Sequence, residues 1–535
     1  MQESPVLYSG SVAGYRAMTT RGDFWRTALP IFVVAMAVTT IFPNLITGLH
    51  GDEAWVILRA HEIGSGSHAF EGMNFYTSAL NQYLAWPFLA ASGFQFSALR
   101  VAAGLCNSIG LLFALAILRA LHPHETATWR WTGALWVTSA SFIAFSRFAV
   151  DVNMLTPFLV LMALWLAIVA TRLGAGTAFY AGSLGSGLAF GMAVYNHLLA
   201  AALVAGLAIG AFAGFGRAML RARCTWLIAA AFFCAITPRV VLVVTAMSHG
   251  AGPTFGTVFD AIKDLQFLPS VLIGMLDGGV IFQRFTGERL VPVIPYFSFA
   301  LVGLGCANWW YASGLRLAPV DRAMLVGWIA MPVLILLITP GLSLRYFQFP
   351  ALITSYAIVR FAQSCHSAIG RSVLAAVLVL QVGYVAVDYF WAFARSGGRL
   401  SNFSLGSRLM ETSNHFVRTD NLYRQLVAAG VTDVYAEPLL IWPLASYDIV
   451  FHHFAVFILD PRNVAAVSPT SAARRPAIIA YNAPSLIGSQ STADLTILHQ
   501  LDIGPFRFKR RLEFEQKFIV LIGEQDFEST SKTRR

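Results

Sequence analysis

The sequence predicts an all-α polytopic membrane bundle of about 11 transmembrane helices with interfacial helices, followed by a small C-terminal extramembrane α/β domain. Three observations predict this fold class. Of the 535 residues, 57% are hydrophobic and 12% are charged, whereas about a quarter of the residues in soluble domains are charged. Successive apolar stretches are long enough to cross about 30 Å of hydrocarbon as helices. Residues 394–535, by contrast, are polar enough to fold outside the membrane.

The predicted spans follow from apolar windows of about 20 residues. They lie near residues 28–49, 97–118, 131–150, 154–171, 176–195, 198–216, 225–247, 290–312, 323–340, 346–363 and 372–393. Only Asn196 and His197 separate the fifth span from the sixth, so these two residues are expected at the tip of a helical hairpin. The first span follows Arg16, Arg21 and Arg26 and is too long for the apolar core of a signal peptide, so we expect it to stay uncleaved.

Arginine residues in the short loops set the orientation. These loops hold Arg119, Arg130, Arg172, Arg217, Arg221, Arg223, Arg316, Arg322, Arg360 and Arg371. All of these loops fall on the side of the N-terminus, and the positive-inside rule makes that side cytoplasmic. We therefore expect a multi-pass protein of the bacterial inner membrane, with residues 1–27 cytoplasmic and a transmembrane domain over 28–393. Its outer loops span 50–96 and 248–289, and the domain at 394–535 is periplasmic or extracellular.

The polar segments carry their own secondary-structure signals. In the first outer loop, a short amphipathic run through Trp86 and Pro87 is too short to span and is expected to lie at the interface. In the C-terminal region, β-rich runs predict strands over Val431–Tyr435, Ala477–Ala480 and Phe518–Ile522, and a helical period covers Asn414–Ala429.

Charge and cysteine content exclude some classes of function. The net charge is +10, but the cations are arginines scattered between apolar segments, so membrane topology explains them better than a nucleic-acid surface. We expect membrane lipids as surroundings and no nucleic-acid partner. The five cysteines form no CxxC pair and lie in or beside apolar segments, so disulfides are not expected to matter.

The acidic dyad of Asp52 and Glu53 follows the first span at the head of an outer loop. A carboxylate costs about 3 kcal/mol at the bilayer centre on insertion scales, so acids at a helix exit mark either a solvated interface or a working site. Both interpretations stay open from the dyad alone.

Four motifs occur in order over about the first 400 residues. They are Gly51-Asp52-Glu53, Phe96-Ser97-Ala98-Leu99-Arg100-Val101, Phe145-Ser146-Arg147-Phe148 with Asp151, and Leu344-Arg345-Tyr346-Phe347-Gln348-Phe349-Pro350. Together they resemble the GT-C superfamily of membrane glycosyltransferases. The nearest group is that of the protein O-mannosyltransferases, lipid A aminoarabinose transferases and rhizobial lipid A galacturonosyltransferases. The resemblance implies a GT-C-like bundle with interfacial helices in the first loop.

The resemblance also implies a reaction. Such enzymes move a sugar from a polyprenyl-phosphate donor to a glycolipid, polysaccharide or protein acceptor on the external face of the membrane. Asp52, the first acid of the motif, is the expected general base, and a single displacement would invert the anomeric carbon. Glu53 is expected to assist, to hold a metal, or simply to face water. No cofactor is predicted outright, and a divalent metal stays an open alternative.

The leaving phosphate calls for fixed cations, and guanidinium groups bind phosphate bidentately. By the motif, Arg345 and Tyr346 are the expected donor-phosphate contacts, with Arg284 as a second cation. Arg345 alone also fits a snorkelling interfacial cation. His197, Asn196 and Glu71 are candidate substrate contacts, although a polar hairpin tip is the default interpretation of the first two. Arg100 and Arg147 are expected to be structural, pairing at the membrane surface.

One element of the resemblance is missing. Many relatives carry Lys/His-Pro-Pro-Leu after the first loop, where this chain has Tyr76-Thr77-Ser78-Ala79-Leu80, so neither sugar nor acceptor transfers from them. His61-Glu62 with Glu53 suggests a metal site, but no cluster has the ligand spacing of a zinc site.

Two rival functions remain. A transporter or lipid flippase predicts charges at mid-span and broken helices related by an internal repeat, and Arg239 beside Pro238 favours it. A non-catalytic assembly factor is the third interpretation, which the missing proline element favours and the retained Asp52, Glu53 and Arg345 oppose.

Overall fold

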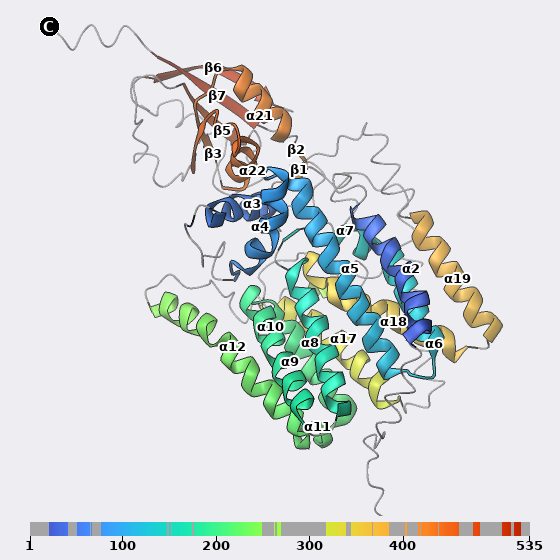
Figure 1. Ribbon diagram of the computed structural model, residues 1–535. Coiled ribbons are helices and arrows are strands. Elements are labelled where there is room, and N and C mark those ends of the chain that lie inside the picture. Colours follow the sequence, from blue (N-terminus) through green and yellow to red (C-terminus); the bar gives the residue numbers. More distant parts are fainter. Residues whose placement is uncertain are drawn as a thin grey trace, which may run out of the picture.

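The computed structural model has two parts, a bundle of helices and a C-terminal β-sheet flanked by helices (Figure 1). It describes residues 21–40, 51–64, 66, 76–146, 149–150, 152–173, 176–248, 262, 265–268, 317–338, 344–365, 367–384, 402–403, 416–417, 419–436, 438–458, 475–481, 506–514 and 518–525.

The helical part contains long apolar helices and short interfacial ones. Its α-helices are α2 (Arg21–Thr40), α3 (Gly51–Gly64), α4 (Leu80–Ser92), α5 (Phe96–Leu121), α6 (Thr126–Thr138), α7 (Ala140–Phe145), α8 (Leu155–Leu173), α9 (Thr177–Asn196), α10 (Ala200–Phe215), α11 (Arg217–Arg221), α12 (Arg223–Ser248), α17 (Pro319–Ile338), α18 (Gln348–Ser364) and α19 (Ser367–Tyr384). Short 3-10 turns lie at η1 (Leu265–Phe267) and η2 (Leu344–Phe347).

Four of these helices are long and apolar enough to cross a membrane, among the residues that the structure describes. Three shorter apolar helices accompany them, within α2, α10 and α19. Each predicted span of which most residues are described overlaps at least one helix. The span expected near 290–312 lies outside the described residues. The predicted fifth and sixth spans are two separate helices, α9 and α10.

The predicted third span, 131–150, is not one helix. Ser139 has an extended backbone between α6 and α7, and its side chain accepts a hydrogen bond from the backbone N–H of Phe142. A serine hydroxyl that satisfies a backbone group in this way competes with the helical ladder. The segment is therefore broken into α6 and the short α7.

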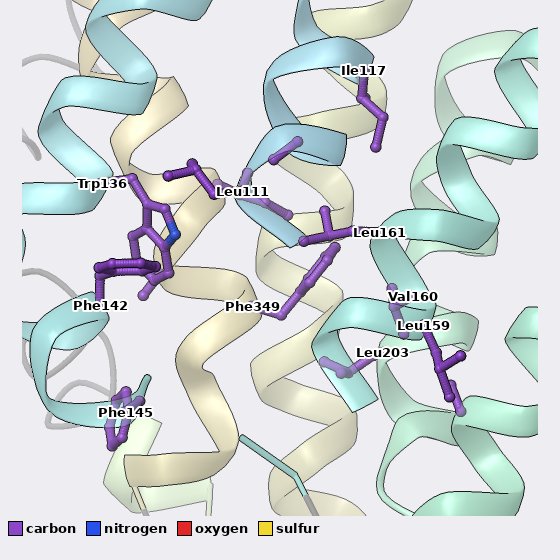
Figure 2. Close-up of a cluster of buried hydrophobic side chains, with 14 of the residues drawn as sticks. Leu111, Ile117, Trp136, Phe142, Phe145, Leu159, Val160, Leu161, Leu203 and Phe349 are labelled. Carbon is purple, nitrogen blue, oxygen red and sulfur yellow. The ribbon is translucent and has the colours of Figure 1, made fainter. Parts of the chain in front are cut away.

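The largest apolar cluster among the described residues of the bundle has side chains from α2, from α5 through α10 and from α17 and α18. In Figure 2, Leu111, Leu161 and Phe349 point toward one another from α5, α8 and α18. Within lipid, van der Waals contacts between such side chains, rather than their removal from water, stabilise the packing. Figure 2 also shows Trp136 beside Phe142, whose rings lie 5.6 Å apart between centroids.

Close backbone approach joins α10 to α17. A Cβ on Gly206, Gly210 or Gly214 would collide with atoms of α17, including the carbonyl oxygen of Ala323. Glycine lets two helices pack at short distance where lipid supplies no hydrophobic drive for their association.

The C-terminal part is a five-stranded mixed sheet in the order β4-β3-β5-β7-β6. Its strands are β3 (Asp433–Ala436), β4 (Ala455–Ile458), β5 (Pro476–Tyr481), β6 (Phe506–Phe514) and β7 (Phe518–Gln525). β3 pairs in parallel with β4 and β5, and β7 pairs antiparallel with β5 and β6. Helices α21 (Thr419–Ala428) and α22 (Pro438–Asp448) share an apolar core with the sheet. A short antiparallel pair, β1 (Asn402–Phe403) and β2 (Phe416–Val417), precedes it.

Candidate functional site

The acidic dyad lies on the first turn of helix α3, not in a loop as the sequence predicted. Acids in a first turn are favourable because the helix dipole is positive at that end. Asp52 is half-buried, while Glu53 has no exposed side-chain surface. The two neighbouring carboxylates thus have different surroundings.

Glu53 is tied to two other segments. Arg100 on α5 donates from Nε to Oε1 at 2.9 Å and from Nη2 to Oε2 at 2.7 Å, which is a bidentate pair. The backbone N–H of Ala149, in the loop between α7 and α8, donates to Oε1 at 3.2 Å. Glu53 therefore does not face water, which was one of the expected roles. The structural pairing expected of Arg100 is confirmed.

The loop that begins at Ala149 leads to a buried network of amides. Asn153 donates to Gln348 Oε1 at 3.0 Å, and Gln348 donates to Asn107 Oδ1 at 2.8 Å. Asn107 in turn donates to the backbone oxygen of Asn153 at 2.6 Å. These contacts join α5, the start of α8 and the start of α18. Gln348 directly follows η2, which contains Arg345 and Tyr346 in the chain.

The turn between α9 and α10 forms the other side of the site. His197 makes a β-bridge with Thr77, and the backbone N–H of Ser78 donates to the oxygen of Asn196 at 2.9 Å. Asn196 also donates from its side chain to Thr156 Oγ1, at the start of α8, at 3.1 Å. The first outer loop is thereby fastened to the hairpin tip.

His197 and Tyr346 lie side by side, with ring centroids 6.2 Å apart. The backbone N–H of Leu199 donates to Nδ1 of His197 at 3.1 Å. A nitrogen that accepts a hydrogen bond carries no proton, so the ring proton of His197 lies on Nε2. The imidazole is therefore a neutral hydrogen-bond donor in this arrangement.

Helix direction explains why these segments meet. Helices α5, α8, α10 and α18 begin at the same end of the bundle, and α9 ends there. We call this end, which carries Glu53, Asn196 and Gln348, the site end. It brings Tyr346 next to His197. Ala149 connects the same region to the turn that bears Asp52. Glu71, Arg284, Arg147, Asp151 and the side chain of Arg345 lie outside the described residues.

A small cavity of about 20 Å³ lies beside the amide network. Asn107 and Gln348 form its polar end, and apolar side chains form the rest of its wall. These apolar residues are Leu111, Trp136, Phe142, Pro157, Phe158, Leu161, Phe349 and Leu352, several of which appear in Figure 2.

The buried amides escaped the sequence analysis. Asn107, Asn153, Gln348 and Asn81 are all nearly or fully buried, and both amide atoms of Asn81 lack a hydrogen-bond partner. The signal was present, because polar side chains within apolar segments tend to be functional or paired. It was weak because each amide is isolated in the sequence.

The sequence left a divalent metal site open as an alternative. Among the described residues, no three His, Cys, Asp or Glu side chains lie close enough together to hold a metal ion. His61 packs its ring 4.8 Å from that of Phe94, between centroids, and Glu62 pairs with Arg59 at 2.5 Å.

The opposite end of the bundle, the arginine end, carries the cationic loops with Arg119, Arg172 and Arg360. There, Arg360 makes two 3.0 Å bonds to the buried carboxylate of Asp321, which also accepts from the Tyr356 hydroxyl. His122 bonds to Tyr356 at 2.8 Å. Burial lowers the pKa of His122, which favours its neutral ring. This network joins α17, α18 and the C-terminal end of α5 at the arginine end, away from the candidate site.

Comparisons with known proteins address the fold. No family model matches the sequence, and no curated protein matches it. The structure of ArnT from Cupriavidus metallidurans bound to undecaprenyl phosphate is similar, with a TM-score of 0.56 and 12% identity over 92% of this chain and 97% of that chain. ArnT in the apo state gives a TM-score of 0.53 and 13% identity, over 95% of this chain and 98% of that chain.

The oligosaccharyltransferase of Archaeoglobus fulgidus in its apo form is more distant, with a TM-score of 0.48 at 12% identity, over 86% of this chain and 69% of that chain. The likeness to ArnT covers both the bundle and the C-terminal part. The fold that the resemblance implied is thus the fold that this chain shares with ArnT.

Proposed function

We propose that this chain is a membrane glycosyltransferase that moves a sugar from a polyprenyl-phosphate donor to a lipid, polysaccharide or protein acceptor. One observation carries the proposal: the acid-bearing first turn of α3 and the Tyr346–His197 pair lie at one end of the bundle, joined through Ala149 and the buried amides. The fold is shared with ArnT, whose structure holds undecaprenyl phosphate.

The donor would bind along α18 and η2. Arg345 and Tyr346 would meet the phosphate, with Nε2–H of His197 as a neutral donor beside them and Arg284 as a second cation. A lipid held in this way needs no nucleotide-binding loop.

Asp52 would act as the general base. It would take the proton of the acceptor hydroxyl as that oxygen attacks the anomeric carbon, while the bond from that carbon to the phosphate oxygen breaks. The lipid phosphate leaves with the electron pair, and the fixed donors stabilise its charge. A single attack of this kind inverts the configuration. Glu53, whose charge is already matched by Arg100, would hold the turn in place rather than move protons.

The membrane orientation follows from the two ends of the bundle. Because arginine-rich loops favour the cytoplasm, the arginine end would be cytoplasmic and the site end would face outward. The C-terminal sheet, which follows on the site end, would lie outside the bacterial inner membrane.

A transporter or lipid flippase remains the second candidate, because Arg239 in α12 is only 4% exposed. A buried cation within a span is typical of transport pathways. The ion pairs Glu53–Arg100 and Asp321–Arg360, whose acids are buried, lie instead near helix ends, where an interfacial enzyme would have them.

Transfer from a panel of radiolabelled polyprenyl-phosphate sugars into membrane lipid extract tests the proposal. We expect wild-type protein to transfer one sugar, and Asp52→Asn to lose about 100-fold or more of the rate, because the base is gone. Asp420→Asn is the matched control: this acid also lies in the first turn of a helix, α21, and is paired with Arg424. It should transfer at the wild-type rate.

The outcomes separate the alternatives. No transfer by the wild type from any donor would favour the transporter or the assembly factor. Full activity of Asp52→Asn would keep the reaction class and reject Asp52 as the base. Retention of configuration at the anomeric carbon of the product would reject the single displacement.

A further inference from the structure

Helix α22 of the C-terminal part packs directly on α3, the helix that bears the acidic dyad (Figure 1). Ile449, with Trp442 and Tyr447 at its edge, belongs to the same apolar cluster as Ala54 and Trp55. The C-terminal sheet is therefore anchored to the helix on which the proposed base lies, and not only to the membrane bundle in general.

A buried hydrogen bond reaches the first turn of α3 from this helix. Ser446 Oγ donates to the backbone oxygen of Ala54 at 3.0 Å, and the serine is 7% exposed. A carbonyl oxygen has two lone pairs, and the helix uses only one of them for its own ladder. The serine therefore adds a restraint without breaking the helix.

The first turn of α3 is thus held from two sides. Glu53 fastens it to α5 and to the α7–α8 loop, and Ala54 fastens it to α22. Asp52 immediately precedes both anchored residues in the chain. The direction of the Asp52 side chain therefore depends on the position of the first turn of α3, which contacts with both the bundle and the C-terminal part determine.

We propose that Ser446 is a positioning residue for the transfer reaction: its bond to Ala54 sets the first turn of α3 and hence the direction of Asp52. The inference rests on the proposed function, because it assumes that Asp52 meets the acceptor. It gives the C-terminal part a role within the catalytic machinery.

Ser446→Ala tests this. A shift of about 1 Å in a reacting group costs on the order of 100-fold in rate. We expect kcat to fall about 10- to 100-fold. KM for the polyprenyl-phosphate donor should stay the same, because its contacts on η2 and α18 are untouched. Ser446→Cys keeps a weak hydrogen-bond donor, so its kcat should lie between those of the wild type and Ser446→Ala.

Ser186→Ala is the matched control. Ser186 on α9 is also a buried serine that donates to a carbonyl of another helix, that of Ala163 on α8, at 2.8 Å. Both variants should lose a similar amount of thermal stability, but only Ser446→Ala should lower kcat. Equal kcat values for the two variants would overturn the proposal.

Hydrogen–deuterium exchange of the α3 backbone amides provides a readout that does not require activity. Exchange within the first two turns of α3 should rise in Ser446→Ala and stay at the wild-type level in Ser186→Ala. Unchanged exchange in α3 would overturn the proposal even if transfer falls. If the wild type transfers no sugar, the proposed function fails, whereas the exchange data still decide whether α22 restrains this turn.

Discussion

The Glu53–Arg100 pair is the most deeply buried charge contact at the site end, and both side chains are 1% exposed. Two charges removed from water are stable only with good mutual geometry and further hydrogen bonds. The bidentate contact and the Ala149 N–H supply both. If the turn moved away from α5, each buried charge would lose its partner, which is energetically costly. The pair therefore holds the first turn of α3 in place.

We expect Glu53→Leu or Arg100→Leu alone to destabilise the protein by about 3–5 kcal/mol, because each leaves one buried charge without its partner. The double variant should be less destabilised than either single one. Unfolding midpoints in detergent, combined in a double-mutant cycle, measure this coupling.

Additive effects in that cycle would show that the two side chains stabilise the fold independently. Activity gives a separate answer about Glu53. If the double variant regains stability and still transfers sugar, Glu53 has a structural role only. If it is stable but inactive, Glu53 takes part in the chemistry.

At the residue level, the sequence was sufficient to find the dyad but not to tell its members apart. The difference between Asp52 and Glu53 arises from Arg100 and Ala149, and these contacts span 47 and 96 residues of sequence. The amide network was missed for the same reason: Asn107 and Gln348 meet only because α5 and α18 begin at the same end of the bundle.

At the level of elements, the packing of α10 on α17 depends on glycine. We expect Gly210→Ala to destabilise the bundle by about 1–3 kcal/mol, because the added methyl group meets the carbonyl oxygen of Ala323. Thermal unfolding in detergent measures the change.

Gly383→Ala on α19 is the control, because a Cβ there has no atom within 4 Å. It should be neutral or stabilise by up to about 1 kcal/mol, since alanine favours a helix over glycine. If both substitutions stabilise the protein, the close packing of α10 on α17 at Gly210 does not contribute to the stability of the bundle.

Apolar length predicted most helices, because burial in lipid depends on little else. It did not reveal the break at Ser139, which one side-chain hydrogen bond produces. It also left α3 as a loop, although acids in a first turn are a known start signal for a helix. In the C-terminal part, the strands predicted at Val431–Tyr435, Ala477–Ala480 and Phe518–Ile522 overlap β3, β5 and β7, but their order in the sheet depends on long-range pairing.

At the scale of the whole molecule, the proposed orientation is open to test through the two ends of α5. Gln95 and His124 flank this helix and are exposed. The 26-residue helix would be about 39 Å long, enough to separate them across the membrane. In a background without native cysteines, Gln95→Cys should react with an impermeant maleimide in cells whose outer membrane alone is permeable.

His124→Cys should react only after the inner membrane is opened. The reverse pattern would place the acidic dyad in the cytoplasm and reject an external reaction. Labelling of both sites in intact cells would show that α5 does not span the membrane.

The contacts of α3 also have a consequence for how the protein is made. The ribosome delivers Glu53 early, yet Arg100 follows 47 residues later and Ser446 is 392 residues beyond Ala54. The turn bearing Asp52 is therefore synthesised long before the last of its contacts can form. Until α22 has been synthesised and folded, a nascent chain can insert its helices without yet assembling the proposed active site.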